Sequence, residues 1–279
     1  RPAPRQLACR DRSLCVGREP LLVGILNLTD DSFFDGGRYV GFDAAINQAE
    51  RMVSEGAAMI DIGGQSTRPG YQEIGAAEEI AKVVPVIGEL LKRVAVPLSI
   101  DTYKPEVARA ALEVGAHVLN DVHGLQGNPE LARLAAEFRC PVIVMHQEAG
   151  FPESQGDTIK KMKAFFTRSM EIAGQAGVPR DNLIIDPGIG FAKAHKQNLE
   201  ILARLSDLKA LGCPLLLGAS RKSVIGNVLS LPPSERLEGT LATTALAVWQ
   251  GVDFLRVHDV LANARVVKMI EAIRHFSHS

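Results

Sequence analysis

The sequence predicts an α/β protein whose eight strands close into a (β/α)8 TIM barrel, preceded by a short β-hairpin. Three observations lead to this fold class. Apolar runs typical of buried strands alternate with amphipathic stretches typical of helices over residues 21–275. The alternation yields eight strand–helix units that recur roughly every 33 residues, a suitable length for a βα unit. No Pro/Gly-rich linker or low-complexity segment interrupts the units, so we expect parallel strands, numerous enough to close a barrel.

The first strand argues against the structural alternative, an open doubly wound sheet. Such a sheet usually has fewer strands and a glycine-rich first βα turn, whereas this chain has Leu26-Asn27-Leu28-Thr29 there. Gly115 and Gly177 each follow a helical pattern where a C-terminal cap would fall. The expected strands are 21–26, 59–62, 98–100, 118–119, 142–145, 183–185, 215–217 and 254–257. The expected helices are 44–55, 76–93, 105–113, 130–138, 159–176, 199–211, 240–250 and 263–275.

Residues 1–20 precede the alternation, and we expect them to form a small hairpin that closes the bottom of the barrel. Barrel and extension then make a single domain over residues 1–279, although a prior of about 150 residues per domain suggests two. Cys9 and Cys15 could oppose each other in the hairpin, and we expect a reduced pair rather than a disulfide. The N-terminus lacks the apolar stretch of a signal peptide, so a cytoplasmic location is expected.

The composition excludes several classes of protein. With 46% apolar residues the chain is not wholly disordered. Its 31 basic and 32 acidic side chains leave a net charge of −1, which gives no general attraction for nucleic acid or an anionic membrane. No run of 18 apolar residues is present, so no transmembrane helix is expected. The single tryptophan, Trp249, lies in an apolar helical stretch, where we expect it to join the core.

Polar side chains stand at the expected C-terminal end of every strand, where barrels of this type carry their functional groups. Carboxylates and amides follow the early strands, and cations follow the last two. Any single position could be polar merely because it meets solvent, but together they predict a cup that accepts N–H groups of a ligand and binds an anion. The positions are Asn27, Asp61, Asp101, Asn120, Asp121, His146, Asp186, Ser220, Arg221, Lys222, Arg256 and His258.

The last two loops predict where the anion binds. Barrels often hold phosphate in the loops after strands 7 and 8, which here contain Ser220-Arg221-Lys222-Ser223 and Arg256-Val257-His258. Residues 221–223 also open an expected helix, whose free N–H groups attract anions. The run from Gly218 does not have the Walker A spacing. The alternative is that Lys222 is a solvated lysine at a helix start.

Two other loops are candidates for contacts with a ligand. Residues 63–70 join glycines, hydroxyls and one arginine directly after a strand, which suits close contact with a phosphate. Residues 27–37 join acidic residues, two phenylalanines and two glycines, and form either a mobile lid or an ordinary acidic surface loop. His146 is either a catalytic base or a hydrogen-bonding residue of the rim, and we favour the second. Neither an H-E-x-x-H nor a G-x-S-x-G motif is present.

Short motifs in a fixed order make the sequence resemble the dihydropteroate synthase family, whose fold is a (β/α)8 barrel. The resemblance runs through nearly the whole chain, and together the motifs are highly specific. They are Gly24-Ile25-Leu26-Asn27, Asp31-Ser32-Phe33, Asp35-Gly36-Gly37, Ser66-Thr67-Arg68-Pro69-Gly70, Asp101-Thr102, Asn120-Asp121, Met145-His146, Asp186-Pro187-Gly188-Ile189-Gly190-Phe191, Ser220-Arg221-Lys222-Ser223 and Arg256-Val257-His258.

The resemblance implies condensation of 6-hydroxymethyl-7,8-dihydropterin diphosphate with p-aminobenzoate, which gives 7,8-dihydropteroate and pyrophosphate. It implies Mg²⁺ as cofactor, with Asn27 as a ligand, and a homodimer as the assembly. The pterin would meet Asp101, Asn120, Met145, Asp186, Lys222 and Arg256. The diphosphate would meet Asn27, Thr67, Arg68, Arg256 and His258, and p-aminobenzoate would meet Phe33, Thr67, Arg68, Pro69, Phe191 and Ser223. The residues expected to be catalytic are Asp31, Asp101, Lys222 and Arg256.

Four departures from the family pattern lead to a further hypothesis. Asp30 and Phe34 replace a proline and a small residue in the first loop, while Gln65 and Tyr103 replace a common Glu and Ser. An altered response to sulfonamides follows as a hypothesis. Two other functions stay open at this point: a barrel that transfers a methyl group from methyltetrahydrofolate, and a barrel that binds pterin without catalysis.

Overall fold

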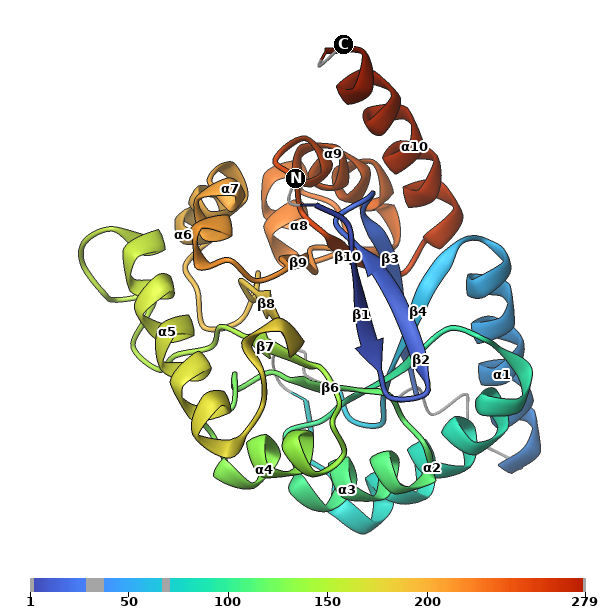
Figure 1. Cartoon of the computed structure of the whole chain (residues 1–279). Helices are drawn as coiled ribbons and strands as arrows, with labels where there is room; N and C mark the ends of the chain where they lie inside the picture. The colour runs from blue at the N-terminus through green and yellow to red at the C-terminus, as the bar shows by residue number, and fades with distance from the viewer. Residues whose placement is uncertain (1–2, 29–37, 67–70, 278–279) are drawn as a thin grey trace.

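Eight parallel strands form the barrel at the centre of the computed structural model, which describes residues 3–28, 38–66 and 71–277 (Figure 1). The strand order in the sheet is β8-β7-β6-β5-β4-β3-β10-β9, so each strand lies next to its neighbour in the chain except where β3 meets β10. The strands are β3 (Leu21–Asn27), β4 (Ala57–Gly63), β5 (Leu98–Asp101), β6 (Val118–Asp121), β7 (Val142–Met145), β8 (Leu183–Asp186), β9 (Leu216–Leu217) and β10 (Phe254–Val257).

The two ends of this sheet meet between β8 and the start of β9. A parallel bridge joins Ile185 to Leu215, and the amide of Ile185 donates to the carbonyl of Pro214 at 2.9 Å. The sheet is therefore closed on itself, which confirms the predicted barrel and removes the free edges that an open sheet would expose.

Helices surround the barrel, as Figure 1 shows. The predicted helix over 199–211 breaks at Arg204, whose backbone adopts φ −123° and ψ 27°, outside the helical region. The helix predicted to open at residue 221 begins at Ser223, because Arg221 has a positive φ of 56°. The helices are α1 (Arg38–Ser54), α2 (Ala76–Arg93), α3 (Pro105–Val114), α4 (Pro129–Glu137), α5 (Thr158–Ala176), α6 (His195–Ala203), α7 (Leu205–Leu208), α8 (Ser223–Leu229), α9 (Leu237–Trp249) and α10 (Val260–Ser277).

The N-terminal hairpin closes the bottom of the barrel, as predicted. Strands β1 (Arg5–Cys9) and β2 (Arg12–Val16) are antiparallel, with Cys9 opposite Arg12 and Cys15 opposite Gln6. This register means that the two cysteines do not oppose each other, and both thiols are free. The apolar side of the hairpin packs into the barrel as part of one buried cluster, namely Leu7, Cys9, Leu14, Val16, Val23, Met59, Val118, Ile143, Ile184, Leu216 and Phe254.

Two arginines fasten the hairpin to the helices around it. Arg10 Nη1 donates to the carbonyls of Leu112 and Ala116 at 2.7 and 2.6 Å, where α3 ends. Arg12 donates to the carbonyls of Leu91 and Val96 at 3.0 and 2.5 Å, around the end of α2. Each arginine thus bonds to carbonyls at or just beyond the C-terminal end of a helix, where carbonyls lack their full set of helical partners.

The prediction that Trp249 joins the core is wrong, because this side chain is 54% exposed at the C-terminal end of α9. Helix α9 is apolar on more than one side, and only one side can face the barrel. The outer side lies next to α10, which also exposes apolar side chains. Among the helices that the structure describes, none is both long and apolar enough to cross a membrane.

Candidate active site

The inward-facing residues of the strands are apolar at the bottom of the barrel and mostly polar two positions later, at its top. The buried cluster below contains Met59, Val118, Ile184 and Phe254. Because side chains alternate between the two faces of a strand, the residues two positions later also point into the barrel. Those residues include the charged and amide groups that the sequence places at the strand ends. A small cavity lies there, lined by Asp101, Asn120, Val122, Met145, Asp186, Phe191, Gly218, Lys222 and Arg256.

An ion-pair network crosses four strands beneath one side of this cavity. Arg256 Nε donates to Asp61 Oδ2 at 2.7 Å, and its Nη2 donates to Asp101 Oδ2 at 3.3 Å. Asp61 also accepts from Asn120 Nδ2 at 3.1 Å and from Ser99 Oγ at 2.6 Å. The residues come from β4, β5, β6 and β10, so the closed barrel is what brings them together.

On the other side of the cavity, Lys222 is the cation. Its ammonium donates to the carbonyl of Ile189 at 2.6 Å and lies 4.7 Å from the centre of the Phe191 ring. Asp186 accepts from the amide of Gly188 at 2.8 Å, which turns the loop after β8 over the cavity. Gly218 contributes no side chain, and a Cβ there would lie 3.8 Å from Arg256 Cβ. The missing side chain keeps this part of the cavity open.

Burial shifts the charged groups of the cavity toward their neutral forms. Burial, and then the nearby carboxylate of Asp61, raise the pKa of Asp101 to about 7, against the effect of Arg256. Burial also raises the pKa of Asp186 and lowers the pKa of Lys222 to about 8. Perturbed groups gathered in one cavity are typical of a functional site. These carboxyl and ammonium groups can accept hydrogen bonds from, and donate them to, a polar ligand in the cavity.

Lys193 holds the loop after β8 in place, a role that the sequence analysis did not predict. Its ammonium donates to the carbonyls of His146 and Phe191, both at 2.9 Å. Burial lowers the pKa of Lys193 to about 7. The loop that carries Ile189 and Phe191 is therefore held between two lysines, with Lys222 bonded to the carbonyl of Ile189.

The preferred prediction for His146, a hydrogen-bonding side chain at the rim, is wrong. The ring is fully buried, and neither nitrogen has a hydrogen-bond partner among the described residues. Phe151 and Phe165 stand edge-on to it, with ring centres 4.5 and 4.7 Å away. Burial lowers the pKa of His146 to about 3, so the neutral imidazole packs as an aromatic side chain.

Other predicted residues stand around the cavity without lining it. Asn27 lies where β3 ends, and a Cβ added to Gly63 would be 3.6 Å from its Oδ1 and 3.7 Å from Asp101 Oδ2. His258 is half-buried, and its Nδ1 lies 2.7 Å from Ser220 Oγ. Ser223 is exposed at the first residue of α8.

Two members of the predicted cup point elsewhere. Arg221 pairs with Asp259 at 2.7 Å, so its charge is directed away from Lys222. The carboxylate of Asp121 accepts from the amides of His123 and Leu125, at 2.9 and 2.7 Å, and therefore holds the following loop. Of the remaining predicted residues, Asp31, Phe33, Thr67, Arg68 and Pro69 lie outside the described residues, as do Asp30 and Phe34.

The two family departures that the structure describes contact each other. Gln65 Nε2 donates to the hydroxyl of Tyr103 at 2.9 Å, and Tyr103 donates to Glu73 Oε1 at 2.9 Å. Lys104 donates to Gln65 Oε1 at 2.7 Å and forms an ion pair with the buried Glu79 at 2.9 Å. This network lies beside the cup, at the two flanks of residues 67–70.

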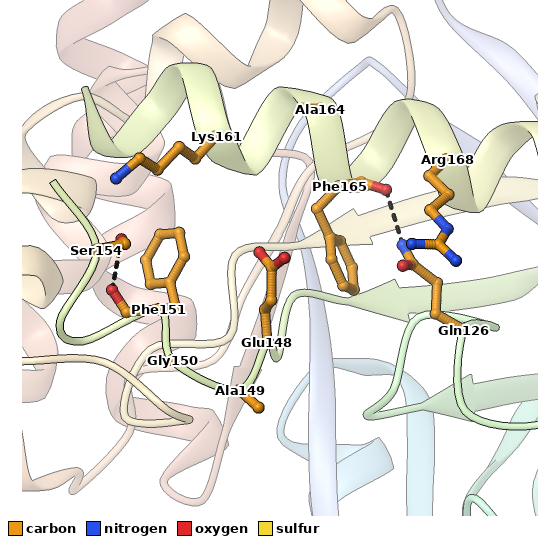
Figure 2. A pocket seen from close by; sticks show the side chains of 10 residues that line it. All are labelled: Gln126, Glu148, Ala149, Gly150, Phe151, Ser154, Lys161, Ala164, Phe165 and Arg168. Carbon is orange, nitrogen blue, oxygen red and sulfur yellow. Dashed lines mark hydrogen bonds between the residues drawn. The ribbon is translucent and has the colours of Figure 1, made fainter. Parts of the chain in front are cut away.

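A larger cavity lies between α5 and the loop after β7, as Figure 2 shows. Phe151 and Phe165 stand on either side of Glu148, and Lys161 and Arg168 extend from α5 at its two ends (Figure 2). None of the strand-end groups of the cup lines this cavity. The convergence of charged groups therefore favours the smaller cavity as the active site.

The described residues offer few ligands for a metal ion. No group of three or more His, Cys, Asp or Glu side chains comes together in the described part of the chain. Asn27 presents a hard amide oxygen, and a Cβ added to Gly63 would meet both this oxygen and Asp101 Oδ2, at 3.6 and 3.7 Å. Mg²⁺ typically keeps several waters and uses one or two protein oxygens together with substrate phosphates. One amide oxygen is compatible with such a site, and Mg²⁺ stays a prediction.

Comparison with known proteins agrees with this geometry. The family described as pterin binding enzyme matches residues 23–258, from β3 to the end of the barrel. The dihydropteroate synthase of Bacillus subtilis is 45% identical over 262 residues, which cover 94% of this chain and 91% of that protein. The match is therefore not confined to the motifs around the cavity.

Solved structures give the same result. The dihydropteroate synthase of Clostridium difficile, determined in the presence of pteroic acid, is 46% identical with a TM-score of 0.89, covering 92% of this chain and 98% of that one. The enzyme of Xanthomonas albilineans with 4-aminobenzoic acid is 39% identical with a TM-score of 0.91, covering 98% and 99%. The chain belongs to the dihydropteroate synthase family of pterin-binding enzymes.

Proposed function

We propose that the cavity at the top of the barrel binds 6-hydroxymethyl-7,8-dihydropterin diphosphate and joins it to p-aminobenzoate, with release of pyrophosphate. The observation that carries this proposal is the cavity lined by Asp101, Asn120, Asp186, Lys222 and Arg256. Two carboxylates, an amide and two cations line this one cavity, with Arg256 beside Asp101 and Lys222 on the other side. That arrangement suits a flat ligand with N–H donors, ring acceptors and an anionic group.

The pterin ring fits the polar groups of the cavity by hydrogen-bond type. The carboxylates of Asp101 and Asp186 would accept from its amino and ring N–H groups, and the ammonium of Lys222 would donate to its ring acceptors. Met145 is buried at the end of β7 and supplies an apolar wall for the ring. A site built from buried polar groups rejects analogues that leave those groups unpaired.

The diphosphate would extend from the pterin toward Asn27 and His258. Arg256 would lie near both the pterin and the diphosphate. A Mg²⁺ ion held by Asn27 and the diphosphate would stabilise the negative charge of departing pyrophosphate. The Arg256 guanidinium stays charged, since Asp61 and Asp101 raise its pKa against the effect of burial. It is thus a fixed cation for developing negative charge.

The reaction requires no nucleophile from the protein. The bond between the pterin methylene and the diphosphate oxygen breaks with its electron pair leaving on pyrophosphate, and the amine nitrogen of p-aminobenzoate bonds to the methylene and loses a proton. Phe191 and Ser223 flank Lys222 on the side where p-aminobenzoate would enter. A dissociative route would give a sizeable secondary isotope effect at the methylene, and its absence would count against that route.

The experiment that tests the proposal is release of pyrophosphate by the purified protein. Release should require both substrates and Mg²⁺, and 7,8-dihydropteroate should form in equal amount. No release with both substrates at saturation would overturn the proposal. Transfer of a methyl group from methyltetrahydrofolate, or pterin binding without turnover, would favour one of the two alternatives that the sequence leaves open.

We also propose that the protein is a cytoplasmic homodimer. The adjacent helices α9 and α10 expose six large apolar side chains, namely Leu246, Trp249, Leu261, Met269, Ile273 and Phe276, the last of them 86% exposed. Large exposed apolar patches mark interaction surfaces, and these side chains supply apolar area on two adjacent helices. Free thiols at all four cysteines suit a reducing compartment. Sedimentation should give the mass of a dimer, and Trp249→Asp should give a monomer, whereas a monomeric wild type would contradict the proposal.

A further inference from the structure

The carboxylate of Asp61 is the buried centre of the network beneath the cavity. Its side chain is 0% exposed and does not line the cavity, so it cannot touch a ligand there. It nevertheless accepts three hydrogen bonds, from Ser99 at 2.6 Å, Arg256 at 2.7 Å and Asn120 at 3.1 Å. Two of these three donors line the cavity. The hydrogen bonds of Asp61 therefore reach the cavity only through Arg256 and Asn120.

The contact with Asn120 decides which end of that amide meets the ligand. An ionised carboxylate only accepts hydrogen bonds, so Asn120 must direct its NH₂ group at Asp61. The carbonyl oxygen of Asn120 is then the end left for the cavity. A ligand opposite it must supply an N–H donor, as the amino and ring nitrogens of a pterin do.

The contact with Arg256 decides the direction of the guanidinium. Nε is bonded to Asp61 and Nη2 to Asp101, so two of its three nitrogens are held by carboxylates on neighbouring strands. Planar guanidinium groups bonded in this forked way are fixed in orientation. Without Asp61, only the longer contact of 3.3 Å with Asp101 would hold the plane of Arg256.

We propose that Asp61 is the positioning residue for pterin recognition, because it fixes the amide of Asn120 and the guanidinium of Arg256. The proposal rests on the proposed function of this cavity. It predicts that loss of the Asp61 carboxylate weakens pterin binding specifically, although Asp61 never touches the pterin. Removal of one polar partner leaves buried donors unsatisfied, and the ligand must then restore their orientation when it binds.

Asp61→Asn tests the proposal, because it keeps the shape of the side chain but removes its charge and half of its acceptors. Isothermal titration should show Kd for the pterin diphosphate raised by at least about tenfold, the scale of a lost charged hydrogen bond. Steady-state kinetics should show the same loss in kcat/KM for the pterin, with KM for p-aminobenzoate within about twofold of wild type. Ser99→Ala removes only the third contact and should raise the pterin Kd less.

A matched control separates positioning from stability. Asp253 is another buried carboxylate, 4% exposed, directly before β10 at the bottom of the barrel. It accepts from the amide of Leu215 at 2.9 Å. Asp253→Asn should lower the thermal unfolding midpoint but leave the pterin Kd unchanged.

A double-mutant cycle tests the route through Asn120. The losses caused by Asp61→Asn and Asn120→Ala should be less than additive in pterin Kd, since both remove the same oriented amide. Additive losses would exclude that route. Unchanged pterin affinity in folded Asp61→Asn would overturn the proposal, and if that variant does not fold, unchanged affinity in Ser99→Ala would do so. A wild type that binds no pterin would instead overturn the proposed function.

Discussion

The two ends of the barrel are built from the same strands but do opposite things. At the bottom, Met59 on β4 and Phe254 on β10 are buried in an apolar cluster that the hairpin closes. Two residues later, Asp61 and Arg256 on the same strands form an ion pair at 2.7 Å. On both strands, a shift of two residues thus changes the surroundings from close apolar packing to a charged network.

The bottom of the barrel therefore contributes mainly to stability, and the top mainly to ligand recognition. Apolar packing at the bottom favours folding through burial, whereas buried charges at the top cost solvation free energy and are only partly compensated by their partners. Substitutions at the bottom should therefore change the free energy of unfolding without changing the chemistry. Substitutions at the top should change the chemistry more than they change stability.

The largest expected effect is on stability, at the bottom. Leu7 lies on the hairpin and is 1% exposed within the barrel cluster. Leu7→Ala should lower the free energy of unfolding by about 2–5 kcal/mol, through lost burial and the cavity left behind. Urea denaturation measures this, and kcat at a temperature where the variant is folded should match wild type. Cys15→Ala, at an exposed position of the same hairpin, should change stability by less than about 0.5 kcal/mol.

The next effect is on turnover, at the top. Lys222→Ala and Asp101→Asn should each lower the rate by at least about 10²-fold, the scale of losing a preorganised polar contact. Steady-state release of pyrophosphate measures the loss. Turnover like that of wild type in either variant would contradict the role proposed for that residue. A loss explained entirely by unfolding, seen in circular dichroism, would break the contrast between the two ends.

A smaller effect concerns how the bottom is fastened. Arg10→Met keeps the apolar stem but removes the two hydrogen bonds to the carbonyls of Leu112 and Ala116. We expect a loss of about 1.5–3 kcal/mol in the free energy of unfolding, the usual value for hydrogen bonds that involve a charged group. Thermal unfolding measures it. An effect of Arg10→Met on pterin affinity would show that the two ends are coupled.

The sequence predicted the architecture well because strands and helices leave periodic patterns. Residues 76–93 were expected to be a helix and are α2, and residues 142–145 were expected to be a strand and are β7. The polar strand ends were equally visible, since position alone places Asp101 and Asp186 at the top of a barrel.

What the sequence could not predict depends on contacts between distant elements. Asp61 was visible as a strand end, but its bonds to Asn120 and Arg256 follow from the pairing of strands up to 195 positions apart. His146 was misread because its aromatic neighbours come from a loop and from α5. Trp249 was misread because an apolar helix pattern does not show which side faces the barrel and which side faces solvent.

The smallest expected effect is a pH dependence at the top, due to Lys222. Burial lowers its pKa to about 8, with Arg256 acting in the same direction and Asp186 and Asp101 against it. The ammonium therefore predominates below pH 8 and the neutral amine above it. Pterin affinity should be retained below pH 8 and should fall above it by up to about tenfold per pH unit, if the bound pterin requires the charged form.

Lys222→Arg is the control for this titration, because a guanidinium keeps its charge throughout the range. The variant is expected to bind the pterin less tightly at all pH values, since its shape differs, but the alkaline decrease in affinity should disappear. Isothermal titration from pH 7 to 9.5 measures both proteins. The same decrease in Lys222→Arg would assign it to the ligand or to another group, such as Lys193, whose pKa burial lowers to about 7. If the decrease disappears in Lys222→Arg, the charge that recognises the pterin is that of Lys222, a buried cation at the top of the barrel. The described residues of the apolar cluster at the bottom of the barrel include no charged group that could give such a pH dependence.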